Sequence, residues 1–148
     1  MTAHVVSVCI SESKGTQKKP VPAVDLRENH GIVGDAHAGE WDRQVSLLAV
    51  ESVDKMRKLG AELDAGAFGE NINTEGIDLI ALPIGTHLQV GPTLLEVTKI
   101  GKECHQHCAI YHQVGDCVMP REGIFARVLR GGAVKGGDPI TVLESGRD

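Results

Sequence analysis

The sequence predicts a mainly β fold: one domain over residues 1–148, built as a closed or half-closed barrel with two short helices. Short apolar runs with period-two alternation recur along the chain, and glycine and proline separate them. Only two stretches carry apolar residues at helical spacing. With 41% hydrophobic residues but 3% aromatics, the barrel core must consist mainly of valine, leucine and isoleucine.

The first half of the chain holds three predicted strands. Residues 5–10 form a β-branched run, residues 22–27 a weaker one, and residues 44–48 a buried one. The polar segment 11–20 is a loop with Lys14, Lys18 and Lys19. It is interpreted either as a solvated loop or as an arm that contacts an anion.

Two helices are predicted from their apolar spacing. The first covers residues 50–59 and ends at Gly60, which suits the position after a helix C-terminus. The second covers residues 121–129 and ends at Gly131-Gly132. Its apolar face consists of Ile124, Phe125, Val128 and Leu129.

A hairpin is predicted from the alternating runs 86–90 and 93–100, which are separated by Gly91-Pro92. Residues 140–143 form the last strand. Strand 93–100 leads into the loop 101–108, which concentrates thiols, imidazoles and an amine in a few positions. These residues are Lys102, Cys104, His105, His107 and Cys108. A strand end is a rigid place from which to present reactive groups.

Charge and composition limit the function classes. The net charge of −5 and the pI near 5.8 argue against nucleic acid as the main partner. The N-terminus has no basic region followed by a long apolar run, and no stretch is long enough to span a membrane. A cytoplasmic protein is therefore expected. Its four cysteines should then be reduced, and should be buried, reactive or metal-binding.

Two loops are dense in glycine and polar residues, over 31–43 and over 66–74. Glycines permit positive φ angles and a close approach of the backbone to a ligand. The first loop does not match a dinucleotide or P-loop fingerprint. A binding loop and a plain structural loop both remain open for the first of them.

Several of these stretches carry a family resemblance. They are Gly34-Asp35-Ala36-His37-Ala38-Gly39 with Arg43 soon after, Phe68-Gly69-Glu70-Asn71, Cys104 after its strand, and Gly131-Gly132 followed by Gly137-Asp138. In order and spacing the chain resembles a small stand-alone MOSC domain, the family of the C-terminal region of molybdenum cofactor sulfurase. The resemblance implies a barrel like that of pyruvate kinase and one functional cysteine, Cys104.

The resemblance also implies a role with the molybdenum cofactor (molybdopterin), as a sulfur carrier through a persulfide or as a cofactor-binding domain. Cys104 would be the reactive thiol or the molybdenum ligand, and its neighbours Lys102 and His105 would favour the thiolate. The expected cofactor-binding residues are Asp35, His37, Arg43, Gly69, Glu70, Asn71 and Arg121. Because no aminotransferase-like desulfurase domain is present, no covalently bound pyridoxal phosphate is expected. Because the extra N-terminal barrel domain of the amidoxime-reducing relatives is missing, no independent oxidoreductase activity is expected. The partners would be the cofactor or its sulfur donor and acceptor proteins.

Two alternatives remain. Cys104, Cys108 and Cys117 with one of His105, His107 or His112 would suit a tetrahedral Zn²⁺ ion. The chain could also be a non-catalytic partner of cofactor synthesis enzymes. Cys9, within an apolar strand, should be buried and inert. The loops around Asp35-His37 and Gly69-Asn71 are expected to lie beside Cys104.

Overall fold

The computed structural model describes residues 3–12, 18–41, 43–58, 66, 70–100 and 123–143. Their elements follow one another along the chain as β1 Ala3–Ile10, β2 Lys19–Val21, β3 Ala23–Arg27, β4 Gly31–Ile32, β5 Val45–Ala49, α1 Val50–Lys58, β6 Ile72–Glu75, the 3₁₀ turn η1 Leu79–Ala81, β7 His87–Val90, β8 Thr93–Ile100, β9 Ile124–Arg130, β10 Gly132–Lys135 and β11 Pro139–Leu143. None of the helices in these ranges is long and apolar enough to cross a membrane.

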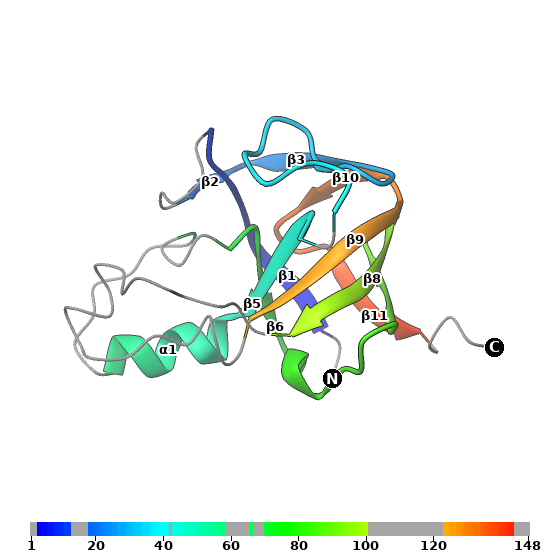
Figure 1. The fold of residues 1–148 in the computed structure, drawn as a ribbon. Coiled ribbons are helices and arrows are strands. Elements are labelled where there is room, and N and C mark those ends of the chain that lie inside the picture. The colour runs from blue at the N-terminus through cyan, green and yellow to red at the C-terminus, as the bar shows by residue number, and fades with distance from the viewer. Residues whose placement is uncertain are drawn as a thin grey trace.

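Seven of the described strands close into a mixed barrel (Figure 1). The order is β11-β7-β8-β9-β5-β6-β1, and β1 closes the ring by pairing with β11 at Ala3↔Ile140. Strand β2 pairs antiparallel with the C-terminal end of β1, from Val8 to Ile10. Strands β10, β3 and β4 form a separate three-stranded sheet at one end. The predicted mainly β barrel is confirmed.

One pair in the barrel is parallel, β5 with β6, and α1 lies between them in the sequence. Parallel neighbours need a long crossover, which a helix commonly supplies. Glu51 in the first turn and Lys55, Arg57 and Lys58 in the last turn complement the helix dipole. The first predicted helix is therefore confirmed over the part of it that the structure describes.

The second predicted helix, 121–129, is wrong: Ile124–Arg130 is strand β9. It pairs antiparallel with β5 on one side and with β8 on the other. Ile124, Ala126 and Val128 are buried at every second position, as a strand requires, but Phe125 between them is buried too. A short apolar run of this kind fits helical spacing as well. The described residues thus contain one α-helix and one 3₁₀ turn. The polar loop expected over 66–74 likewise ends in a strand, β6.

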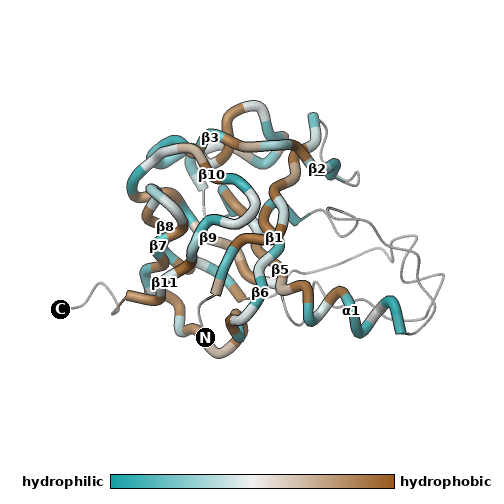
Figure 2. Tube along the Cα trace, turned by 180° about the vertical axis from the view of Figure 1, so that it is seen from behind, coloured by the Kyte–Doolittle hydropathy of each residue, from teal (hydrophilic) through white to brown (hydrophobic). Residues whose placement is uncertain are grey.

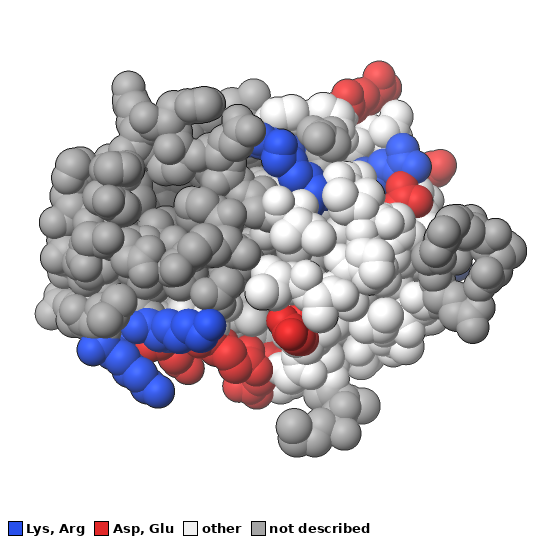
Figure 3. All heavy atoms as spheres, turned by 60° about the horizontal axis from the view of Figure 1, so that its bottom comes forward, with Lys and Arg blue, Asp and Glu red and all other residues white. Residues whose placement is uncertain are grey.

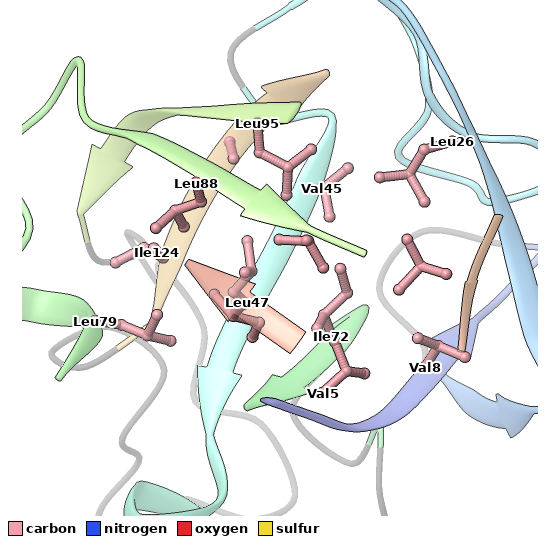
Figure 4. Close-up of a cluster of buried hydrophobic side chains, with 14 of the residues drawn as sticks. Val5, Val8, Leu26, Val45, Leu47, Ile72, Leu79, Leu88, Leu95 and Ile124 are labelled. Carbon is pink, nitrogen blue, oxygen red and sulfur yellow. The ribbon is translucent and has the colours of Figure 1, made fainter. Parts of the chain in front are cut away.

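The core fills the inside of the barrel with aliphatic side chains, as the low aromatic content requires (Figure 4). Leu47, Ile72 and Leu95 are among those with no exposed surface. Viewed from behind and coloured by hydropathy, the apolar residues follow the strands, and the far end of α1 is hydrophilic (Figure 2).

Charged side chains are unevenly spread over the surface. On the face shown in Figure 3, lysine, arginine and acidic residues lie at the edges of a broad uncharged area. Among the described residues on this face, no continuous basic stripe of the kind that follows a nucleic acid backbone is visible.

Candidate functional site

The end of strand β1 is the point on which the candidate site is built. Cys9 is fully buried near this end, and Ser11 follows the strand. The backbone N–H of Ser11 donates to Asp35 Oδ1 at 3.0 Å, which attaches the first glycine-rich loop. The backbone N–H of Cys9 donates to Asn71 O at 2.7 Å, which attaches the second loop. The two polar loops singled out in the sequence therefore meet at one end of one strand.

A lysine with no exposed side-chain surface lies at this junction. Lys18 Nζ is 2.8 Å from Asp35 Oδ1, 3.1 Å from Ser11 Oγ and 3.0 Å from His37 Nδ1. An ammonium group has three N–H donors and no acceptor, so these three partners use all of them. The charge of Lys18 is thus balanced by a carboxylate that is also fully buried.

Asp35 is held as a carboxylate. Burial by itself would raise its pKa, but the hydrogen bond from Lys18 and the backbone N–H groups of Ser11 and His37 hold the pKa below its usual value. The loop turn is closed by His37 N–H, which donates to Asp35 Oδ2 at 3.1 Å. The pair therefore fixes the loop geometry as well as balancing charge.

The geometry also assigns the state of His37. Because Lys18 can only donate, His37 Nδ1 accepts, and the imidazole is neutral with its proton on Nε2. The ring stacks parallel to that of Trp41, with centroids 6.3 Å apart and planes 1° apart. The His37 side chain keeps 23% of its surface exposed, and an imidazole in a fixed orientation can orient or polarise a bound molecule.

The second loop has its polar groups turned inward. Asn71 Oδ1 accepts from the N–H of Ser46 at 3.0 Å, and Asn71 Nδ2 donates to Cys9 O at 3.1 Å. Glu70 Oε2 accepts from Asn73 Nδ2 at 2.7 Å and from the N–H of Gly66 at 3.3 Å. Glu70 and Asn71 thus connect β1, β5 and β6, and their contact with a ligand stays a prediction.

Cys9 behaves as the sequence led us to expect. Burial raises the pKa of its thiol to about 12, the negative charge of Glu70 adds to that rise, and Lys18 offsets part of it. The thiol is therefore neutral at ordinary pH and lies in the core.

The remaining predicted residues separate into two groups. Arg43 lies over the ring of Phe125 on β9, 5.3 Å from its centroid, and its contact with a cofactor stays a prediction. Lys102, Cys104, His105, Arg121 and Gly69 lie outside the described residues, as do Cys108, Cys117 and the histidines of the zinc alternative. The proximity of the two loops to Cys104 and the zinc site therefore stay predictions.

The residue that sequence reasoning missed is Lys18. It was one of three lysines in a polar segment, and nothing in the pattern separated it from its neighbours. The backbone explains its burial: its N–H donates to Gly66 O at 2.8 Å, which draws the residue against the second loop.

Residues 34–141 match the model of the MOSC domain. The chain belongs to the MOSC family. The matched segment contains the first glycine-rich loop from Gly34 onward, the second loop and Cys104, whereas Lys18 precedes it. No protein of curated function matches the sequence significantly.

Solved structures show the same fold. The YuaD protein of Bacillus subtilis superposes with a TM-score of 0.78 at 24% identity, over 95% of this chain and 94% of that one. YiiM of Geobacillus stearothermophilus gives 0.71 at 23% identity, over 96% and 75%. YiiM of Escherichia coli gives 0.68 at 20% identity, over 100% and 72%. At these identities the likeness concerns the fold.

Proposed function

We propose that this MOSC domain carries sulfur for the molybdenum cofactor or binds the cofactor itself, with Cys104 as the reactive thiol. The observation that carries the proposal is the convergence of the two polar, glycine-bearing loops on the end of β1, around buried Lys18. Both loops fall largely within the segment that matches the MOSC model.

The described residues suit the cofactor through their paired charges and their fixed orientation. The charge of Lys18 is balanced by Asp35, so the cluster does not present a bare cation to a ligand. His37 would face a polar group of the cofactor, and the backbone of the loop that carries Asp35 would lie alongside it. When bound, the cofactor supplies a molybdenum centre that can accept a sulfur atom or a thiolate ligand.

As a sulfur carrier, Cys104 would act as a nucleophile. Its thiolate attacks the outer sulfur of a persulfide or polysulfide donor, and a new S–S bond forms as the S–S bond of the donor breaks. The shortened donor leaves as a thiolate, so no further oxidant is needed. The sulfur donor and acceptor would be other proteins that handle the cofactor. Lys102 and His105 would stabilise the Cys104 thiolate.

The test is to treat the purified chain with inorganic polysulfide and measure its intact mass under non-reducing conditions. We expect the wild type to gain sulfur and Cys104→Ser to gain none at that site. Cys108→Ser and Cys117→Ser are matched controls in the same segment and should still be loaded. Loading that survives Cys104→Ser but is lost in either control would refute the assignment.

Metal and ligand content of the untreated protein tests the alternative function. Pterin and molybdenum that co-purify with the chain would support cofactor binding, and loss of the molybdenum in Cys104→Ser would support Cys104 as its ligand. Stoichiometric zinc that is lost in each of the three cysteine variants would instead establish the zinc-binding module and contradict the proposal.

A further inference from the structure

A pocket of about 270 Å³ lies beside the candidate site and shares a wall with it. It is lined by Asn29, Glu40, Trp41, Thr98 and Arg127. Trp41 is the shared wall, because its ring also stacks on His37. A larger hollow, about 360 Å³, lies between α1 and η1 and is lined by none of the candidate residues.

We propose that the pocket beside Trp41 seats a planar nitrogen heterocycle whose edge carries amino and amide groups, with pterin as the ring. The choice of pterin rests on the proposed function, whereas the recognition of a flat, polar-edged ring rests on the pocket itself. The volume lies just under the roughly 300 Å³ lower limit of common ligand sites. It therefore suits one bicyclic ring rather than a whole cofactor.

Trp41 provides the stacking surface. Its indole N–H donates to His37 O at 2.7 Å, which fixes the plane of the ring. The residue nevertheless keeps 39% of its surface exposed. An indole with a satisfied N–H and an exposed ring offers an apolar, polarisable face to another aromatic ring.

The polar groups around the ring differ in kind. Glu40 contributes a carboxylate, which only accepts, and so matches adjacent N–H groups on a heterocycle. Asn29 Oδ1 already accepts from Gln44 Nε2 at 3.1 Å, so the amide nitrogen is the group that Asn29 can donate. Arg127 uses part of its guanidinium on Glu96, 2.6 Å away, and has further N–H groups to donate.

The backbone around the pocket is pre-organised. Asn29 N–H donates to Val128 O at 2.9 Å, and the buried Gln44 side chain accepts from Val128 N–H at 2.9 Å. Asn29 takes a positive φ of 52°, a conformation that asparagine tolerates better than most residues. These contacts hold Asn29 against β9 before any ligand arrives.

Thr98 reaches the pocket through an irregularity in the sheet. The pairing of β8 with β9 shifts between Val97 and Lys99, which leaves Thr98 as the extra residue. A bulge of this kind re-aims a side chain and is common beside functional sites. This bulge and the turn at Asn29 both shape the pocket, which is therefore part of the barrel wall itself.

The chain offers its own reporter, because Trp41 is the only tryptophan. We would titrate the purified protein with 6-hydroxymethylpterin, follow tryptophan fluorescence with correction for absorbance, and check the affinity by equilibrium dialysis. Saturable quenching is expected in the wild type. Glu40→Gln should weaken binding about tenfold or more, the effect of losing a charge-assisted hydrogen bond. Glu28→Gln, at an exposed site outside the pocket lining, should bind like the wild type.

Two further ligands make the result decisive. Quinoxaline has a similar size but no amino-amide edge; equal affinity for it, with no effect of Glu40→Gln, would show unspecific stacking and overturn the proposal. Tighter binding of adenine than of the pterin would also overturn it. Cys104→Ser should bind the pterin normally. Loss of polysulfide loading and loss of pterin binding are therefore separate outcomes, and each refutes a different proposal.

Discussion

Lys18→Met is the substitution that most directly tests the buried cluster at the end of β1. Methionine has a similar length and no charge, so Asp35 would remain in the core as an uncompensated carboxylate. Removing one partner of a buried ion pair costs about 3–5 kcal/mol of unfolding free energy, and we expect a loss in that range. For a domain of this size such a loss is a large part of the total stability.

The size of the effect follows from two opposing quantities. At 2.8 Å, two unit charges attract by about 6 kcal/mol at an effective dielectric constant of about 20. Against this stands the desolvation of both groups, which costs several kcal/mol per ion. Asp35→Asn should therefore also destabilise, but the double variant should lose about 1–3 kcal/mol less than the sum of the two single losses.

The assay is urea unfolding followed by far-UV circular dichroism at neutral pH, on the four proteins of the cycle. Lys135→Met is the matched control, because its pair with Asp138 spans 3.3 Å and its side chain is 69% exposed. Its expected cost is about 0–1 kcal/mol. Additive losses, or a Lys18→Met loss no larger than that of the control, would refute the reasoning.

Two more predictions come from the same region. The folded-state pKa of Asp35 lies below its ordinary value of 3.8, so the ion pair stabilises the fold above about pH 4, and this contribution is lost as pH falls through the lowered pKa. Urea unfolding of Asp35→Asn from about pH 2 to pH 7 should therefore show a weaker loss of stability in acid than the wild type. An equal loss in the two proteins would contradict this assignment. In Gly66→Ala the new Cβ would overlap the backbone carbonyl oxygen of Lys18, at a φ of +85°, so thermal unfolding should reveal a loss of more than about 2 kcal/mol. Gly137→Ala, at a φ of +94° with open space around it, should lose only the backbone cost of about 1–2 kcal/mol, and equal losses would contradict the steric argument.

The barrel was predictable from the sequence because its signals are local. Strands β7 and β8 carry period-two alternation on both sides of a Gly-Pro turn, and pattern and turn chemistry agree there. Strand β9 carries no such agreement. It is a strand because it pairs with β5 and β8, which are far away in the sequence, and a helical face was an equally good local interpretation.

The site was predictable only in part, for a related reason. Asp35 and His37 stood out because they lie among glycines, and the structure brings them together with the loop that carries Asn71. Lys18 did not stand out, since a lysine in a polar segment is normally solvated. Its burial depends on Gly66, 48 positions later in the printed sequence, whose carbonyl accepts from its backbone. Long-range contacts of this kind leave no trace in spacing or composition.

The way in which charges are paired in this region limits what kind of recognition it can perform. Lys18 uses its three donors on Ser11, Asp35 and His37, and Arg127 on the neighbouring wall is paired with Glu96. A ligand would therefore meet an oriented imidazole ring and an indole face rather than free positive charge. Recognition by stacking and hydrogen-bond direction is screened little by salt, unlike attraction between exposed charges. Pterin affinity at Trp41 should accordingly change little when the ionic strength rises, whereas a phosphate held by surface lysines would be released.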